Sequence, residues 1–104
     1  MQTEQDLEQL VRAYTPALLR YCTGILGNEH DAQDAVQKTF IKAWQRRYTL
    51  RDRENNTRAW LYRIAYRTAL ARIHGVPAPY LRTRYSRAKA KLAAILQEGE
   101  HDDL

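Results

Sequence analysis

The stretch from residue 57 to residue 73 limits most strongly what this chain can fold into. It contains neither glycine nor proline, and its apolar residues recur at intervals of three and four. That spacing places Leu61, Ile64, Ala65 and Thr68 on one face of a helix. We therefore predict a long helix here that buries one side in a core.

A second face of the same helix combines arginine with aromatic residues. Trp60, Arg63 and Arg67 follow the spacing i, i+3, i+7, and Tyr62 and Tyr66 are four residues apart. Guanidinium groups suit phosphates, and aromatic rings suit bases that stack. Two interpretations stay open at this point: a nucleic-acid surface, or a core helix with a buried Trp and solvated arginines.

The charge is divided unevenly along the 104 residues, whose formal net charge is +5. Residues 1–45 have a net charge of −2, residues 46–91 of +11, and residues 92–104 of −4. One strongly cationic segment indicates a polyanionic partner. An anionic membrane surface would fit the charge, but the basic segment has no long apolar anchor, which disfavours that partner.

Other features of the sequence indicate where in the cell the protein is found. No apolar run approaches the roughly 18 residues of a membrane span, and the N-terminus is acidic where a signal peptide would be basic. Cys22 is the one cysteine, so it has no partner for an internal disulfide, and we expect it to be buried. We expect a cytoplasmic protein that does not contact a membrane.

The chain contains signals for the start and end of five helices, which predict an all-α fold, a compact helical bundle. Thr3 and Asp6 form a capping-box pattern, Thr15-Pro16 predicts a restart, Gly27 an end and Asn28 a new cap. The predicted helices cover residues 3–14, 15–26, 29–46, 57–73 and about 80–98, with a loop over 47–56.

This order predicts four parts. They are a helical domain over 1–75, a Pro-containing link over 76–79, a basic amphipathic helix over 80–98 and an acidic tail over 99–104. We expect Asn56 or Thr57 to cap the fourth helix. The expected inward face of the third helix consists of Ala32, Ala35, Val36, Thr39, Phe40 and Ala43, and the expected apolar stripe of the fifth consists of Leu81, Tyr85, Ala88, Leu92, Ile95 and Leu96.

The residues do not predict an enzyme, a cofactor or a metal site. The three histidines are far apart, Cys22 has no thiol partner, and no Gly-rich phosphate loop occurs. Asp31 and Asp34 lie in the first turns of a predicted helix, where carboxylates usually interact with the helix dipole.

Three blocks in order resemble region 2 of bacterial sigma factors, especially the extracytoplasmic-function group. They are residues 14–21 (Tyr-Thr-Pro-Ala-Leu-Leu-Arg-Tyr), residues 26–44 with the Asp-Ala-x-Asp-x-x-Gln pattern, and residues 59–65 (Ala-Trp-Leu-Tyr-Arg-Ile-Ala). The resemblance covers about two-thirds of the chain, residues 7–73.

The resemblance implies two partners and the residues that meet them. It implies that the clamp helices of core RNA polymerase contact Asp31, Asp34, Gln37 and Lys38. It implies that the −10 element of promoter DNA contacts a loop and a helix, the loop capturing a flipped base. We expect those contacts from Tyr48, Arg51, Arg53, Asn55, Asn56, Arg58, Trp60, Arg63, Tyr66 and Arg67. An anti-sigma factor is a further partner that the family implies.

The chain also departs from the family. Lys38 stands where the family usually has Glu, and Tyr66-Arg67-Thr68 stands where Arg-Asn-Arg is usual. Residues 81–92 resemble only the last helix of region 4, so their apolar stripe must pack on the bundle or on a second copy in a homodimer. Arg84, Arg87 and Lys91 on this helix are candidates for an additional contact with DNA or a partner.

Three functions fit these observations. The first is a sigma-like factor that binds core polymerase and the −10 region to start transcription. The second is a regulatory or decoy protein with the sigma fold that dimerises or binds polymerase without initiation. The third is a general single-strand binder, whose affinity would fall steeply with salt.

Overall fold

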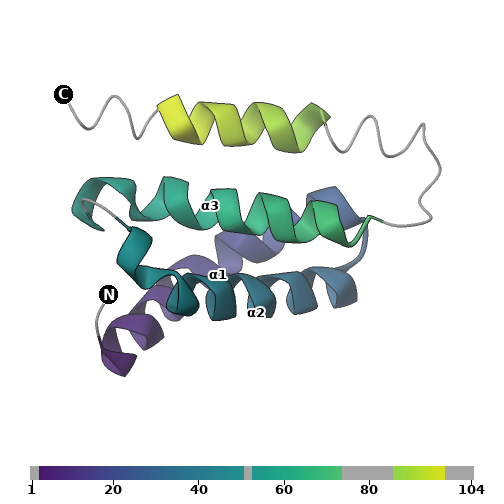
Figure 1. Cartoon of the computed structure of the whole chain (residues 1–104). Helices are drawn as coiled ribbons and strands as arrows, with labels where there is room; N and C mark the ends of the chain where they lie inside the picture. Colours follow the sequence, from purple (N-terminus) through teal and green to yellow (C-terminus); the bar gives the residue numbers. More distant parts are fainter. Residues whose placement is uncertain (1–2, 51–52, 74–85, 98–104) are drawn as a thin grey trace.

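The computed structural model describes residues 3–50, 53–73 and 86–97, and these residues form a helical bundle without strands (Figure 1). The prediction of an all-α fold is confirmed. The elements are α1 (Glu4–Leu26), α2 (Glu29–Gln45), the 3₁₀ helix η1 (Arg47–Thr49), α3 (Arg53–Ala71) and a further helix over residues 86–97.

The predicted break before Pro16 is wrong, because α1 is one helix that contains this proline. Proline removes the N–H that would bind the carbonyl of Arg12. Both residues are exposed, so water can bind that carbonyl. The Thr15 hydroxyl also donates to the carbonyl of Val11 in the preceding turn. Side chains on both sides of Pro16 pack on the core, which favours one continuous helix over a restart.

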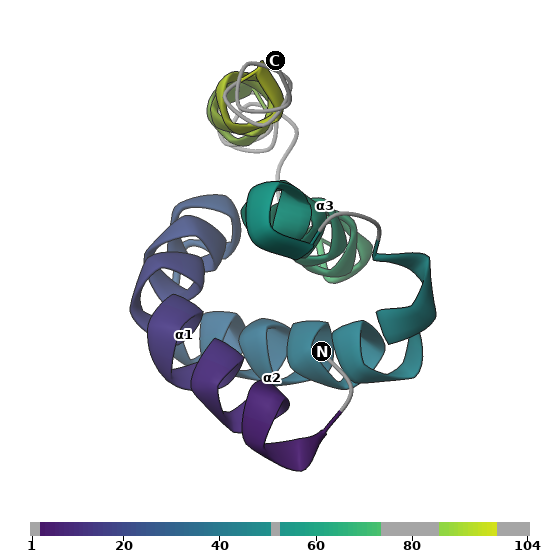
Figure 2. The same cartoon turned by 90° about the vertical axis from the view of Figure 1, so that its left-hand side faces the viewer.

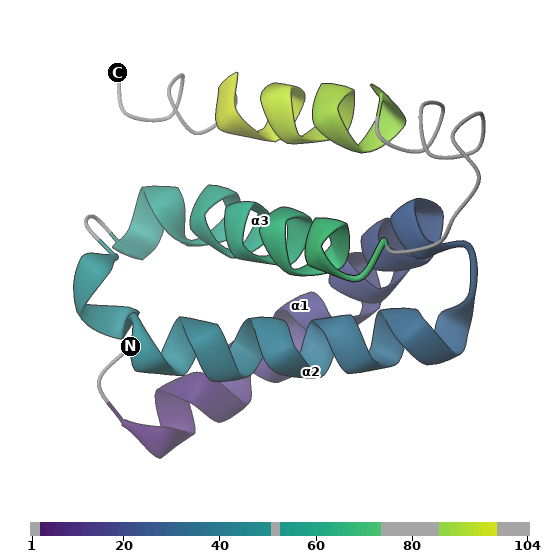
Figure 3. The same cartoon turned by 45° about the vertical axis from the view of Figure 1, so that its right-hand side comes forward.

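The ends of α1 and the start of α2 lie where the caps predict them. The Thr3 hydroxyl accepts from the Asp6 N–H at 3.1 Å, and the Asp6 carboxylate accepts from the Thr3 N–H at 3.2 Å. Gly27 ends α1 with φ 81°, and the Asn28 side chain accepts from the Asp31 N–H at 2.8 Å. Gly27 and Asn28 thus reverse the chain and set α2 against α1 (Figure 3).

The predicted loop over residues 47–56 is too long. Residues 47–49 form η1, and α3 begins at Arg53, so neither Asn56 nor Thr57 is its cap. Extending an existing helix adds one hydrogen bond per residue, which offsets the modest helix propensity of the asparagines. α3 ends at Ala71, a few residues before the end predicted near His74-Gly75. His74 and Gly75 themselves lie outside the described residues.

The core lies where α1, α2 and α3 meet, and α3 lies between α2 and the helix over 86–97 (Figure 2). Each predicted inward side chain is buried: Ala32, Ala35, Val36, Thr39, Phe40 and Ala43 on α2, and Leu61, Ile64, Ala65 and Thr68 on α3. Cys22 is fully buried as predicted, and burial raises the pKa of its thiol to about 12. The Lys42 ammonium reaches across to the Thr68 hydroxyl at 3.1 Å.

The helix over residues 86–97 packs on its own chain, beside α3 (Figures 1 and 3). Ala88 and Ile95 are buried, and the Tyr21 hydroxyl of α1 donates to the Ala88 carbonyl at 3.0 Å. Burial raises the pKa of Tyr21, so this donor keeps its proton. Of the two arrangements left open for the apolar stripe, the structure shows the self-packed one. Its first members, Leu81 and Tyr85, lie outside the described residues.

Candidate functional site

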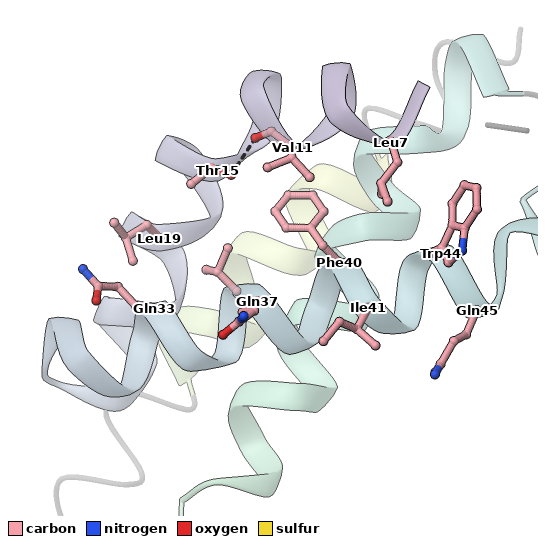
Figure 4. A pocket seen from close by; sticks show the side chains of 11 residues that line it. Leu7, Val11, Thr15, Leu19, Gln33, Gln37, Phe40, Ile41, Trp44 and Gln45 are labelled. Atoms are coloured by element: carbon pink, nitrogen blue, oxygen red, sulfur yellow. Dashed lines mark hydrogen bonds between the residues drawn. The ribbon is translucent and has the colours of Figure 1, made fainter. Parts of the chain in front are cut away.

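An apolar groove of about 670 Å³ runs between α1 and α2 (Figure 4). Ile41 on α2 is 52% exposed at this groove, a large exposure for an apolar side chain in a small domain. The groove is lined by Leu7, Val11, Thr15, Leu19, Gln33, Val36, Gln37, Phe40, Ile41, Trp44 and Gln45. None of these side chains carries a charge, so the groove suits an apolar or amide-rich partner.

The groove has one predicted polymerase contact, Gln37, and several residues that the sequence did not indicate. No partner contact was predicted on α1, although Leu7 and Val11 are one turn apart and only half-buried. On α2, Gln33, Gln37 and Ile41 follow each other at intervals of four and are all exposed. Ile41 was the available signal, since it is an apolar residue next to the predicted inward face.

Asp31 and Asp34, the acidic residues predicted to contact polymerase, form ion pairs within the fold and are also partly exposed. Arg72, just after α3, donates to Asp31 at 3.0 Å and also pairs with Asp34. Lys38 pairs with the same Asp34 carboxylate at 3.1 Å. Hydrogen bonds from the Asn28 side chain and from Arg72 hold the pKa of Asp31 below its usual value. The acids therefore fasten α2 to α3, while their side chains stay about 40% exposed (41% for Asp31, 39% for Asp34).

A cationic pocket of about 350 Å³ lies between the end of α2 and the outer face of α3. The Trp60 indole N–H donates to the Thr49 hydroxyl at 3.2 Å, which fixes the ring as one wall. Arg63 and Arg67 are exposed on successive turns of α3. The pocket is lined by Arg46, Thr49, Trp60, Arg63, Ile64 and Arg67, with no acid among them. Such a lining suits a phosphate beside a planar group.

The pocket brings together Trp60, Arg63 and Arg67 of the predicted DNA contacts, and adds Arg46 and Thr49, which the sequence reasoning left out. Tyr48 lies beside it on η1 and is 80% exposed. Arg46 belonged to a run of basic residues, so the signal was present, but its position depends on where α2 ends.

Other predicted contacts lie elsewhere. Tyr62 is buried and Tyr66 packs against the core, so the expected alternation of arginines and tyrosines on one exposed face is wrong. Arg58 lies over the Tyr62 ring at 5.7 Å, on a different side of α3 from Arg63. Asn56 is half-buried. Arg51 and Arg84 lie outside the described residues, as do the side chains of Arg53 and Asn55.

The C-terminal helix adds cations at a distance from the pocket lining. Arg87 and Lys91 are exposed and lie one turn apart on the helix over 86–97. Their role as an additional contact with DNA or a partner stays a prediction.

Comparison with known proteins agrees with the sequence resemblance. The family model for sigma-70 region 2 matches residues 10–75. The chain belongs to the sigma-70 region 2 family. The match includes the whole of α2 and α3, so the cationic pocket and all of the groove lining except Leu7 lie within the matched range.

Individual relatives belong to the extracytoplasmic-function (ECF) group. The chain is 33% identical over 93 residues to the ECF RNA polymerase sigma factor SigG of Mycobacterium tuberculosis, covering 89% of this chain and 25% of that protein. It is 34% identical over 71 residues to the ECF RNA polymerase sigma factor SigW of Bacillus subtilis, covering 67% of this chain and 37% of that protein. The region 2 chain thus spans about a quarter of the SigG length. No solved structure matches the chain significantly.

Within the described ranges, no helix combines the length and the apolar character that crossing a bilayer requires.

Proposed function

We propose that this region 2 chain is a sigma-like initiation protein that holds core RNA polymerase on one surface and the −10 region of promoter DNA on another. The observation that carries the proposal is the separation of two unlike surfaces on one small bundle. The groove between α1 and α2 has an uncharged lining, and the pocket between η1 and α3 has a cationic one. The relatives' names describe RNA polymerase sigma factors, which supports the same pair of partners.

The groove is the proposed polymerase surface. It contains Gln37, which the family resemblance assigns to the clamp helices, and the exposed Ile41. Asp31, Asp34 and Lys38 form its charged border on α2. A helical partner would place apolar side chains over Phe40 and Trp44 and donate hydrogen bonds to the glutamine amides.

The cationic pocket is the proposed DNA surface. Arg63 and Arg67 would contact phosphates, and Trp60 would meet a base that has left the duplex. Extruding a base costs a few kcal/mol, so a preformed pocket with a fixed indole lowers the cost of holding the melted strand.

The test is a binding assay with core polymerase, with and without fork-junction promoter DNA. Ile41→Glu would place a carboxylate in the groove, and we expect about a 100-fold loss of core binding. Trp60→Ala should leave core binding unchanged and weaken the capture of forked DNA about tenfold. Ala94→Glu is the matched control, because it adds the same charge at an exposed position on the helix over 86–97.

Two results would contradict the proposal. Unchanged core binding by Ile41→Glu would remove the groove from the polymerase surface. Equal affinity of the wild-type complex for −10-type and scrambled strands would favour a general single-strand binder.

A second candidate is a regulatory protein that binds polymerase without initiating transcription. The observation that favours it is the Lys38–Asp34 ion pair, which neutralises an acid on the border of the proposed polymerase surface. Transcription from a −10-type promoter, reconstituted with core polymerase and this chain, would exclude it. Binding of an anti-sigma factor stays a prediction of the family resemblance.

A further inference from the structure

The sequence that follows the helix over residues 86–97 is strongly acidic. This acidic segment, residues 98–104, contains neither lysine nor arginine and has four acids, Glu98, Glu100, Asp102 and Asp103. The acids come after the last described turn of a helix, where the partial negative charge of the helix dipole makes carboxylates unfavourable. Cations elsewhere on the chain would therefore stabilise the acidic segment.

The cationic pocket offers arginines whose charge the fold does not use. Arg63 and Arg67 are exposed, and within the described ranges neither forms an ion pair. Arg46 lines the same pocket from the end of α2, and the lining contains no acid. Guanidinium groups pair with carboxylates as well as with phosphates, often through two parallel hydrogen bonds. The pocket therefore suits a run of carboxylates as well as a nucleic-acid backbone.

The helix over residues 86–97 ends on the side of the bundle where the pocket lies. This helix runs antiparallel to α3, so residue 97 lies towards the beginning of α3, which η1 adjoins (Figures 1 and 3). Ala88 and Ile95 are buried and hold the helix there, together with the hydrogen bond from Tyr21. Seven extended residues span at most about 24 Å, which is about twice the diameter of one helix. The acidic segment is thus long enough to pass round α3 and reach the pocket on its outer face.

We propose that the acidic segment binds the cationic pocket of its own chain and competes there with phosphates. The inference rests on the proposed function, because it concerns the regulation of the same pocket. A segment on a short tether has an effective concentration in the millimolar range. At about 4 mM, a segment whose contacts give a dissociation constant of about 1 mM lowers the apparent affinity of a competing ligand about fivefold. Weakly bound, non-specific strands are thereby excluded, and a strand that core polymerase also holds displaces the segment.

The direct readout is the indole N–H signal of Trp60 in a nitrogen–proton NMR spectrum of the free full chain, because this ring forms a wall of the pocket. The neutralised variant removes three carboxylates of the segment through Glu100→Gln, Asp102→Asn and Asp103→Asn. We expect the Trp60 signals of wild type and this variant to differ at low salt. They should coincide at about 1 M salt, where the Debye length is only about 3 Å.

The functional readout is the affinity of the free chain for a short single-stranded oligonucleotide. The neutralised variant should bind it about fivefold more tightly than wild type at low salt, and equally at high salt. The control variant removes the same number of exposed acids from α1 and α2 through Glu4→Gln, Glu8→Gln and Glu29→Gln. This control should gain less than about twofold in affinity and should leave the Trp60 signal in place.

Three outcomes would overturn the inference and leave the proposed function intact. The first is an identical Trp60 signal in wild type and the neutralised variant at low salt. The second is a difference that grows with protein concentration, which would assign the pocket to the acidic segment of a second copy. The third is an equal gain in affinity by the control variant, which would show that net charge alone acts. A Trp60 difference in a chain that does not bind DNA would support the inference and contradict the proposed function.

Discussion

The outer faces of α2 and α3 both belong to the region 2 fold, but the charged side chains of α2 are paired within the protein and those of α3 face solvent. On α2, Asp31 and Asp34 are paired with Arg72, and what remains exposed along the groove is uncharged. On α3, Arg63 and Arg67 are exposed in a pocket whose lining has no acid. The three arginines between residues 61 and 73 thus divide into one, Arg72, that links two helices and two, Arg63 and Arg67, that face outward.

The pairing of charged side chains decides which kind of partner each of the two faces can bind. An ion pair across α2 and α3 neutralises acids that would otherwise repel a polyanion near the pocket. An unpaired arginine on an exposed turn keeps its charge for a ligand and contributes little to folding. Charge neutralisation therefore favours a neutral, apolar partner on α2 and an anionic partner on α3.

Among changes to the charged side chains of these two faces, the largest effect is expected from reversing the charges on α3. Arg63→Glu combined with Arg67→Glu should weaken the capture of forked DNA about 30-fold, because two phosphate contacts at roughly 1 kcal/mol each are lost. Core polymerase binding without DNA should not change. Fluorescence anisotropy with labelled forked DNA measures the first quantity, and a pull-down measures the second.

A control variant with the same net charge as the α3 variant shows whether DNA binding depends on the position of the arginines or on the total charge. Arg12→Glu combined with Arg20→Glu makes the same change at exposed positions on α1. If this control weakens DNA binding as strongly as the α3 variant, the contrast between the two faces is lost.

An intermediate effect is expected from Arg72→Met, which removes the link between α2 and α3 and keeps most of the side-chain volume. We expect the thermal midpoint to fall by roughly 3–6 °C at neutral pH, as for the loss of a partly exposed ion-pair network. The pKa of Asp31 is lowered in the folded state, so its contribution to stability is present above the ordinary aspartate pKa of about 3.9 and is lost as the pH falls through the folded pKa.

The difference between wild type and Arg72→Met should therefore shrink when the Asp31 carboxylate is protonated. Thermal unfolding followed by circular dichroism at pH 7 and near pH 3 tests this. A difference that stays constant over this range would show that Arg72 stabilises the bundle by packing and not by charge.

The sequence predicted the fold class, the caps at Thr3, Gly27 and Asn28, and the buried faces of α2 and α3, because these depend on local spacing. It placed a break at Pro16 because the cost of a proline is local, whereas the packing that offsets this cost comes from another helix. Tyr62 was misplaced for a related reason. Its position on the helical wheel of α3 allows exposure, but in the fold it is buried in the core, with its ring centre 4.9 Å from that of Tyr21 on α1.

The candidate site was predicted in part. Trp60, Arg63 and Arg67 share a helix face, so their spacing was enough to group them. The groove joins residues about thirty positions apart, such as Val11 and Ile41, and the Arg72 pair joins residues about forty apart. A local sequence pattern cannot predict contacts between residues so far apart in the chain, because these contacts depend on how α1, α2 and α3 cross.

The smallest effect is expected from Lys38→Gln. Whether this substitution tightens or weakens core polymerase binding tests the role of the acids on α2. Lys38 pairs with Asp34 at 3.1 Å with both side chains substantially exposed, so the pair contributes only about 0.4 kcal/mol to stability. If the clamp helices present a cation to Asp34, removing Lys38 removes one competing cation from that carboxylate and should tighten core binding about twofold. DNA capture should not change. Titration calorimetry with core polymerase can resolve this change, and Lys89→Gln on the helix over 86–97 is the control. Weaker core binding by Lys38→Gln would instead make the lysine itself the contact and would count against an acidic border on α2.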